Sequence, residues 1–446
     1  MPAEWKFAAP QKSSRERDDD SAYTKESKMH PPVRHLLTLT IVLLLLPKAL
    51  NTVAQSPPPQ GLSGVWTDGD SSKTLLTNHV LGAAAPLPNG GVIAAGGLAP
   101  GLQGAAAVAL AEIYDPVDAK WKVVTPMSIG RWSLDAIAMK NNKVLFAGGA
   151  SAFSESAVLD SAELFDSASM LFIPVENKMS AARHSYGISM LTDGRVLLTG
   201  GSTKGNSLNG SGTTSTDLYD PEINRFSPAA PLRDGRALHA QVTLKDGRVV
   251  VIGGAQRNAE IYDPASNRWT TFPGLLPTTL KDMKAFETFD HRIFVAGGQN
   301  TQDGLTTDDT WFLDIESGQF TPGPTMQGFN YSPDGSQKGS SDYSAFDLFP
   351  SDHKFSGRYF FFAGGENDPP TGADVELNSS CLFDVANNKF VDLGPMPFIH
   401  DDHTEAMTGL NGKGHPEVLL FGGNSSSGTS RFEFLTESIS SPVTSE

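Results

Sequence analysis

The sequence predicts an all-β fold, a seven-bladed β-propeller of four-stranded antiparallel blades. Three observations lead to this prediction. A Gly-Gly doublet ends an apolar run seven times, an aromatic or leucine residue and then an aromatic residue seven positions later follow six of the doublets, and tight-turn sequences precede them. Self-similarity with a period of roughly 50 residues is typical of propellers, in which each repeat forms one blade.

The doublets mark the second strand of each repeat. Each ends a run such as VVVIGG, and neighbouring doublets are 44 to 67 residues apart. Short runs of this kind predict strands that are buried on both faces between stacked blades. Paired glycines let two backbones approach where no Cβ would fit. The doublets are Gly96-Gly97, Gly148-Gly149, Gly200-Gly201, Gly253-Gly254, Gly297-Gly298, Gly364-Gly365 and Gly422-Gly423.

Two hairpins complete each repeat. Tyr114 is followed seven residues later by Trp121, and the same interval separates an apolar from an aromatic residue in six repeats, the last being Phe383 and Phe390. A constant interval predicts strand, turn, strand. Ahead of the doublets, dipeptides such as Asp193-Gly194 supply the positive φ of a tight hairpin turn. Each repeat therefore predicts four antiparallel strands.

The seventh repeat lacks its fourth strand. Three strands are expected at 405–410, 417–421 and 430–435, and only a polar tail, 436–446, follows them. Residues 62–66 (LSGVW) have the pattern of a fourth strand with its aromatic residue. We therefore expect this N-terminal strand to complete the last blade, so that no sheet edge stays open. The propeller domain is predicted over 55–435, and the tail is expected to be flexible.

The first 54 residues predict export. The apolar run Leu36–Leu46 has 11 residues, whereas a membrane-spanning helix needs about 20. Pro47 follows the run, and small residues precede Gln55, as in a cleavable secretory signal. Met29 is the expected start of this signal, and an uncleaved signal anchor is the alternative. We expect an extracellular or periplasmic protein with no stable transmembrane segment after cleavage.

Charge and cysteine content narrow the classes of partner. The formal net charge of −16 disfavours nucleic acid, whose phosphates it repels, and is compatible with cations or neutral glycans. Cys381 is the single cysteine, so no intrachain disulfide forms and packing must supply the stability. We expect a monomer.

The order of an apolar run, Gly-Gly, Tyr and then Trp resembles the Kelch-repeat family over about residues 62–435. The resemblance implies a propeller whose motif residues serve blade packing. It extends to the central domain of galactose oxidase and glyoxal oxidase, copper-radical enzymes that use a Tyr–Cys cross-link with further Tyr and His ligands. Cys381 lies two residues before Phe383, at a packing position, so no copper ligand carries over. No cofactor is predicted, although a divalent cation is possible.

Basic and histidine residues begin the first strand of several repeats. Arg183, His184 and Arg236 are candidates for binding, and Lys281 and Lys284 occupy a similar place. Recurrence once in each repeat favours hydrogen bonds between blades, because a propeller's ligand site is usually asymmetric. The other interpretation is a ring of groups at the channel mouth that receives a polar or anionic ligand.

The later repeats hold acidic and aromatic candidates. The run His400-Asp401-Asp402-His403 has side chains suited to a divalent metal or to acid–base chemistry, with His400 and His403 as the candidate metal ligands. A solvated acidic loop is the alternative. The insertion 328–347 contains Tyr331 and Tyr343 and resembles an adaptable contact loop.

Two classes of function follow. The leading hypothesis is an exported module that binds a protein or a carbohydrate through its propeller loops. The alternative is a carbohydrate-active isomerase or lyase that uses His400, His403, Arg183 and His184, or a relative of the copper-radical oxidases. The observation that separates them is whether acidic and imidazole groups meet in one deep pocket.

Overall fold

A computed structural model describes residues 63–68, 75, 77–98, 107–205, 212–326, 339–349, 355–367, 375–408, 417–423 and 428–435. All of them belong to one compact unit, Ser56–Glu446. The predicted leader, Tyr331 and the polar tail lie outside the described residues. The described part contains strands only, without a helix long and apolar enough to cross a membrane.

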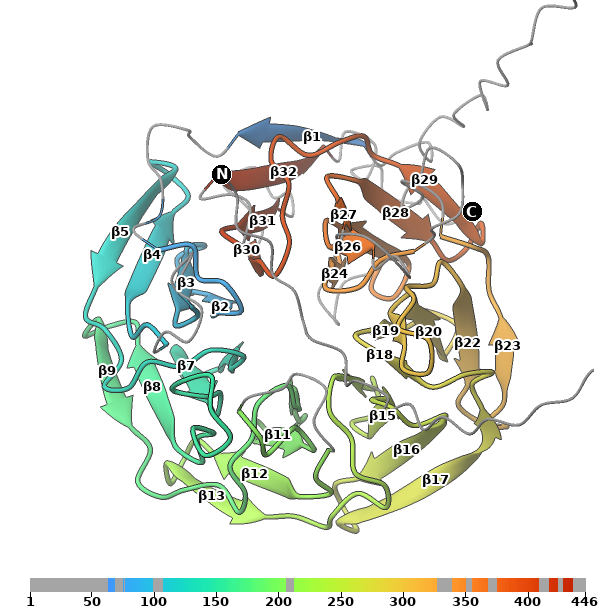
Figure 1. Cartoon of the computed structure of the whole chain (residues 1–446), viewed down its shortest axis with the longest axis horizontal. Coiled ribbons are helices and arrows are strands. Elements are labelled where there is room, and N and C mark those ends of the chain that lie inside the picture. The colour runs from blue at the N-terminus through green and yellow to red at the C-terminus, as the bar shows by residue number, and fades with distance from the viewer. Residues whose placement is uncertain are drawn as a thin grey trace, which may run out of the picture. The chain divides into compact units, whose positions relative to one another are not determined.

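The strands form seven four-stranded antiparallel blades around a central channel (Figure 1), which confirms the predicted architecture. In each of the first six blades the strands pair in chain order from the channel outwards. The first four blades are β2–β5 (Ala83–Pro86, Val92–Ala95, Ala111–Asp115, Lys120–Val124), β6–β9 (Asp135–Ala138, Lys143–Ala147, Ala162–Asp166, Leu171–Pro174), β10–β13 (Gly187–Met190, Val196–Thr199, Thr216–Asp220, Arg225–Pro228) and β14–β17 (His239–Thr243, Val249–Gly253, Asn258–Asp263, Arg268–Leu275).

The remaining blades carry two additions that the sequence did not predict. These are short two-stranded ribbons, β18 (Leu280–Lys281) with β21 (Gln299–Asn300) and β26 (Glu366–Asn367) with β27 (Val375–Glu376). The blades themselves are β19, β20, β22 and β23 (Lys284–Glu287, Arg292–Ala296, Thr310–Asp314, Phe320–Pro322), β24, β25, β28 and β29 (Ser344–Asp347, Tyr359–Ala363, Ser380–Asp384, Lys389–Asp392), and β30, β31, β32 and β1 (Thr404–Thr408, Glu417–Phe421, Thr429–Leu435, Ser63–Asp68).

The N-terminal strand closes the ring, as predicted. β1 pairs antiparallel with β32, Ser63 lying opposite Leu435, and becomes the outermost strand of the seventh blade. Trp66 on β1 packs edge-on against Phe432, with 4.9 Å between ring centroids. Its indole N–H donates to Ser380 Oγ of the sixth blade at 2.9 Å. The first strand of the chain therefore stabilises the two last blades.

The outer hairpins confirm the aromatic spacing. Tyr114 lies directly opposite Trp121, their ring centroids 5.4 Å apart, and the equivalent residues are paired in all six of these hairpins. The Trp121 indole donates to Thr429 Oγ1 of the neighbouring blade at 3.0 Å. In the turn between them, the Asp115 carboxylate accepts the N–H of Val117 at 3.0 Å. The constant seven-residue interval therefore reflects a turn of fixed length, which the aspartate stabilises by accepting a backbone N–H of the turn.

Neighbouring blades approach each other closely at the doublets. Gly96 and Gly97 have φ values of +80° and +94°, which side chains disfavour. A Cβ on Gly96 would lie 2.5 Å from the carbonyl oxygen of Arg131 in the next blade. The N–H of Gly97 donates to that same oxygen at 2.6 Å. Glycine is required here both for backbone conformation and for space.

Closure by β1 predicts a large stability effect from one side chain. Trp66→Ala removes ring packing and the indole hydrogen bond, so we expect the free energy of unfolding to fall by about 3 kcal/mol. Val65→Thr is the matched control, because Val65 is exposed on the same strand. Urea unfolding followed by far-UV circular dichroism measures both. Equal stability of W66A and wild type would contradict the role of β1, as would unchanged melting after deletion of 61–68.

Candidate functional site

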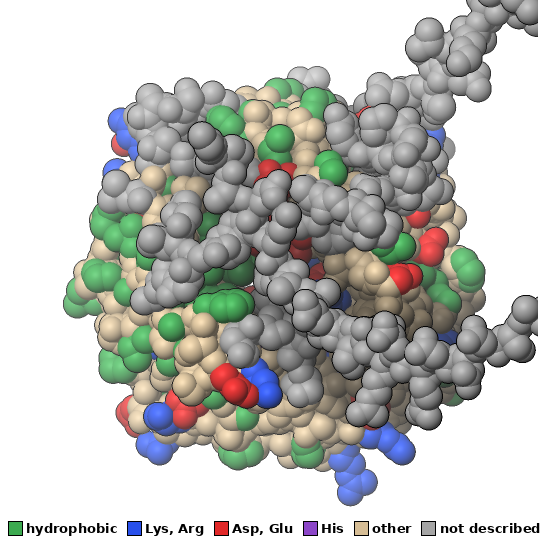
Figure 2. Space-filling view, viewed as in Figure 1, with side chains coloured by type: hydrophobic (Ala, Val, Ile, Leu, Met, Phe, Trp, Pro, Cys, Tyr) green, Lys and Arg blue, Asp and Glu red, His purple; other side chains and the backbone are tan. Residues whose placement is uncertain are grey.

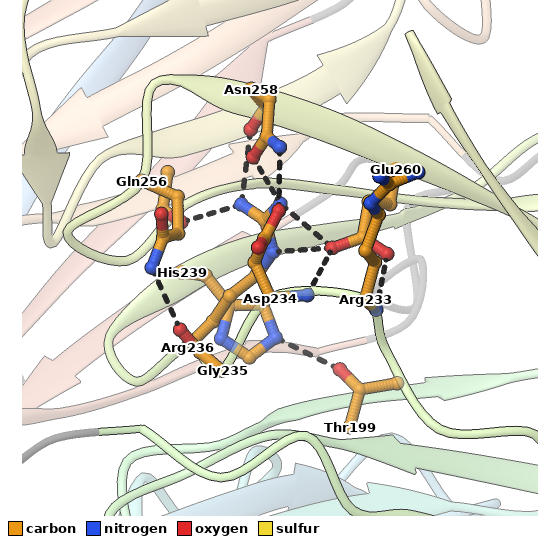
Figure 3. Close-up of polar contacts among 10 residues, drawn as sticks. Thr199, Arg233, Asp234, Gly235, Arg236, His239, Gln256, Asn258 and Glu260 are labelled. Atoms are coloured by element: carbon orange, nitrogen blue, oxygen red, sulfur yellow. Dashed lines mark hydrogen bonds and ion pairs between the residues drawn. The ribbon is translucent and has the colours of Figure 1, made fainter.

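The Arg236 side chain is held by polar groups of its own blade (Figure 3), and its backbone carbonyl contacts the preceding blade. The guanidinium is fully buried and donates to the Gly253 carbonyl at 2.8 Å and to the Asn258 side chain at 2.5 Å. It also pairs with the buried carboxylate of Glu260 at 2.9 Å. The Arg236 carbonyl accepts the N–H of Gly201, in the preceding blade, at 2.7 Å. We use the term latch residue for Arg236 and for the residue at the equivalent position of each other blade.

The latch recurs around the ring with different side chains. In five blades the side chain contacts the carbonyl of the first doublet glycine and a polar residue on the third strand. In the fifth and sixth blades Leu280 and Ser340 take this place, and their carbonyls still accept the doublet N–H of the preceding blade. The five latches are His79 (Gly96, Glu112), Arg131 (Gly148, Glu163), Arg183 (Gly200, Asp217), Arg236 (Gly253, Glu260) and His400 (Gly422, Ser430).

Two residues after each latch place, the chain turns at a residue with positive φ. These seven residues, with φ between +47° and +56°, form what we call the collar. Their backbones are linked across blades: Ser133 N–H donates to the Leu81 carbonyl at 2.8 Å, and Leu81 N–H donates to the Asp402 carbonyl at 2.9 Å. The collar residues are Leu81, Ser133, Ser185, Leu238, Asp282, Asp342 and Asp402.

A cavity of about 430 Å³ lies inside the collar at the channel. The collar and the first strands of the blades line it, and Asp135, Asp282, Asp342 and Lys284 contribute charged side chains. Lys284 Nζ lies 3.7 Å from Glu405 Oε1 of the seventh blade, so this side chain reaches past the sixth. Acidic and basic side chains are visible near the centre of this face in Figure 2. We call this the channel cavity.

Burial changes the protonation of these carboxyl groups. It raises the pKa of Asp135 to about 7, with Lys284 opposing the shift and Glu405 adding to it. Burial also raises the pKa of Asp282 to about 7, and the neighbouring Asp342 raises it further. The pKa of Asp342 is raised by the same loss of solvation. Near neutral pH these groups can donate or accept hydrogen bonds, which suits a polar ligand.

Curated relatives agree with this architecture. Galactose oxidase from Gibberella zeae is 29% identical over 143 residues, 30% of this chain and 20% of that protein. Kelch-like protein 23 from Homo sapiens is 27% identical over 228 residues, 49% and 36% of the two chains. Beta-scruin from Limulus polyphemus is 26% identical over 149 residues, 31% and 15%. No family model matches the chain.

The chain is a seven-bladed β-propeller whose repeats are similar to those of Kelch-repeat proteins. The aligned part covers at most 36% of any of these three relatives. In this propeller Cys381 is buried on β28, packed with Phe294, Phe360 and Phe390 in one apolar cluster, and burial raises the pKa of its thiol. The packing position inferred for it from the sequence is the one observed.

The basic candidates are buried within blades. Arg183, Arg236 and His400 are latch residues, fully buried, and their side chains hydrogen-bond within their own blades, whereas their backbone carbonyls make the contact with the preceding blade. His184 is also buried, with Nε2 2.9 Å from the Lys204 carbonyl oxygen. Burial lowers its pKa. None of these four lines the channel cavity.

The rings of His400 and His403 lie 5.6 Å apart, but the run from His400 to His403 serves different parts of the fold. Asp401 is buried and Asp402 stands half-buried on the collar, whereas His403 lines the channel cavity. His403 Nε2 lies 2.6 Å from Ser344 Oγ, and its ring covers Gly364 of the sixth blade. Burial lowers the pKa of both histidines to about 3. The described residues contain no group of three or more potential metal-binding side chains.

Tyr343 does not belong to an exposed contact loop. It is fully buried, and its hydroxyl donates to the Ala296 carbonyl of the fifth blade at 2.5 Å. It stands one residue after its collar residue, where the side chain packs over the first doublet glycine of the preceding blade. Tyr186 and His403 do the same over Gly148 and Gly364. The tyrosine is therefore part of the contact between blades.

Sequence reasoning missed Asp135, Asp282 and Asp342. A signal existed for Asp282, because in five repeats the collar residue comes 15 positions before the first doublet glycine. Aligning the repeats at that offset places Asp282 beside Ser185 and Leu238. In the sixth and seventh repeats the interval grows to 22 and 20 residues, which hides Asp342 and Asp402 from such an alignment.

Loss of one latch should destabilise the whole ring. Arg236→Met leaves Glu260 buried without its partner, so we expect the free energy of unfolding to fall by about 3–5 kcal/mol. Arg248→Met is the control, because the Arg248–Asp246 pair has a similar separation, 2.6 Å, but is exposed. That change should cost less than about 1 kcal/mol. Similar losses for both variants in chemical unfolding would contradict the latch.

The buried His403 predicts acid lability. Its pKa is about 3 in the folded chain, against 6.5 ordinarily, so below pH 6.5 the unfolded chain binds a proton that the folded chain does not. Stability is therefore lost as pH falls below 6.5, by about 1.4 kcal/mol per pH unit for this residue.

His403→Tyr should remove that part of the pH dependence. Tyrosine already occupies the equivalent place in two blades, at Tyr186 and Tyr343, so the variant is expected to fold. Between pH 6.5 and 5 it should lose about 2 kcal/mol less stability than wild type. Urea unfolding across this range measures the difference. Parallel pH profiles would show that the imidazole does not titrate as its burial requires.

Proposed function

We propose that this propeller is an exported binding module whose ligand docks on the collar face and places a group in the channel cavity. The observation that carries the proposal is the cavity itself, which brings carboxyl, amine, amide and hydroxyl groups together at one end of the channel. Its volume is within the range of roughly 300–1,000 Å³ that is usual for ligand pockets. Export rests on the N-terminal signal sequence.

Adjacent loops support docking on this face. The loops that carry the latch residues pair with the loops after the doublets, as Trp132 does with Ala150 and His184 with Ser202. Binding surfaces on rigid folds are commonly built from such loops. These loops therefore provide a rim around the cavity for a larger ligand.

The relatives leave two ligand classes open. One relative is named for galactose, which favours a carbohydrate, and another is named Kelch-like protein 23 without reference to a ligand. Carboxylates and amides that line a cavity suit the hydroxyl groups of a sugar and equally the polar side chains of a protein loop. Protein and carbohydrate ligands are therefore tested side by side.

Filling the channel cavity should abolish binding. Ala345→Gln puts a longer side chain into the cavity, and the equivalent places in the third and fourth blades already hold Ile188 and Gln241. We expect ligand capture to weaken at least tenfold. Glycan arrays and affinity capture from the exported fraction, with the purified full chain, measure this.

Lys140→Ala is the control, because Lys140 is exposed at a separate pocket shared with Asp193. Unchanged capture by the Ala345→Gln protein would overturn the choice of this cavity.

The same preparation also tests export, since the N-terminal sequence of an exported chain should begin near Gln55. A chain retained inside the cell with its first residues intact would contradict export.

A further inference from the structure

The collar is chemically asymmetric around its ring. Four consecutive blades, the first to the fourth, present Leu81, Ser133, Ser185 and Leu238, whereas the next three present aspartates. All seven residues share the same left-handed backbone conformation, so the difference lies in the side chains. One side of the channel mouth is therefore apolar or neutral, and the other is acidic.

Carboxylates outnumber amines in and beside the channel cavity. Lys281 Nζ lies 3.6 Å from Asp282, and Lys284 lies 3.7 Å from Glu405. Within the described residues, Asp135 and Asp342 have no hydrogen bond or ion pair at their carboxyl groups. The cations that act on these two half-buried carboxyl groups are Lys284 and, for Asp342, also Lys281, and each lysine is already paired with another carboxylate.

The two histidines at the cavity wall, His239 and His403, are neutral and add no positive charge. His239 is more than nine-tenths buried, and burial lowers its pKa to about 3. Thr199 Oγ1 donates to Gln241, so it accepts from His239 Nε2–H, and Nδ1 is left as a bare acceptor. This Nδ1 has no partner among the described residues, and the same is true of His403 Nδ1. Both rings line the cavity.

A ligand that fits these walls needs an apolar stem and a cationic head with several N–H donors. The stem would lie against Leu81 and Leu238, and the head would meet Asp282 and Asp342 across the mouth. The aspartates are spread over neighbouring blades, which suits the five N–H groups of a planar guanidinium better than a point ion.

We propose that the channel cavity binds an arginine side chain presented by a loop of a partner protein. This inference rests on the proposed function and names its ligand. An arginine side chain combines the apolar stem and the cationic fork that the collar requires. The acidic net charge of the whole chain, −16, is compatible with a basic partner surface. Raised pKa values of Asp135 and Asp282 make a cationic ligand bind more tightly as pH rises through about 7.

The test uses the full chain and a short acetylated Gly-Arg-Gly amide. The same peptide with citrulline, which has the shape of arginine without its charge, is the matched ligand. We expect the arginine peptide to bind at least tenfold more tightly in isothermal titration at pH 8. Affinity for the arginine peptide should fall as pH is lowered from 8 to 6, with little change for citrulline.

The variant Asp282→Asn/Asp342→Asn identifies the site. Asparagine keeps the shape and tolerates positive φ, so the fold should be retained, and melting temperature verifies this. We expect at least tenfold weaker binding of the arginine peptide. Asp118→Asn, at an exposed turn of the first blade, should bind like wild type.

Equal binding of both peptides, or unchanged binding by the doubly substituted collar, would overturn the arginine proposal. The proposed function fails separately. If Ala345→Gln abolishes capture of a glycan or of a protein without an exposed arginine, the cavity is the site and only its ligand was misassigned. If Ala345→Gln leaves every capture unchanged, the cavity is not the binding site.

Discussion

The hydrogen bond from a doublet glycine to the carbonyl of the next latch residue is the contact on which the rest of the structure depends. It holds two blades at a distance that admits no Cβ, and it recurs at all seven boundaries, with Asn78 in place of His79 at the last. In five blades the latch side chain then returns to the doublet of its own blade. Each blade is thereby fixed to its neighbour by backbone, and five of them are also fixed internally by a buried polar side chain.

This arrangement explains why the ring tolerates such different side chains at equivalent places. Arginine, histidine, serine and leucine all occupy the latch place, because the inter-blade contact uses the backbone carbonyl. Buried arginine–carboxylate pairs add little net stability relative to apolar replacements, but they penalise incorrect partners strongly. The three arginine blades are adjacent, and the two blades without a long polar latch follow them. The backbone contact between blades is therefore the same around the ring, whereas the latch side chain differs from blade to blade.

This contrast between repeated backbone contacts and varied side chains explains how much of the structure the sequence predicted. Repeats, hairpins, doublets and closure by residues near Trp66 depend on backbone geometry, which glycine, Asp-Gly and aromatic spacing report directly. The channel cavity depends on side chains from blades far apart in sequence, such as Asp135 and Glu405, whose proximity only the closed ring creates. His400 and His403 are neighbours in sequence, yet one enters a latch and the other covers the preceding blade. Local clustering of reactive residues was therefore a poor guide to the site.

Closure by β1 also determines how the propeller responds to mechanical load. Ser63 lies opposite Leu435, so the chain leaves the β1–β32 pair at the same end on both strands. Tension between the chain ends would open this pair like a zipper, one hydrogen bond after another, instead of shearing all its bonds together. The strand that seals the ring is thus also the first to yield to pulling, while the latches between the other blades bear no load until it has detached.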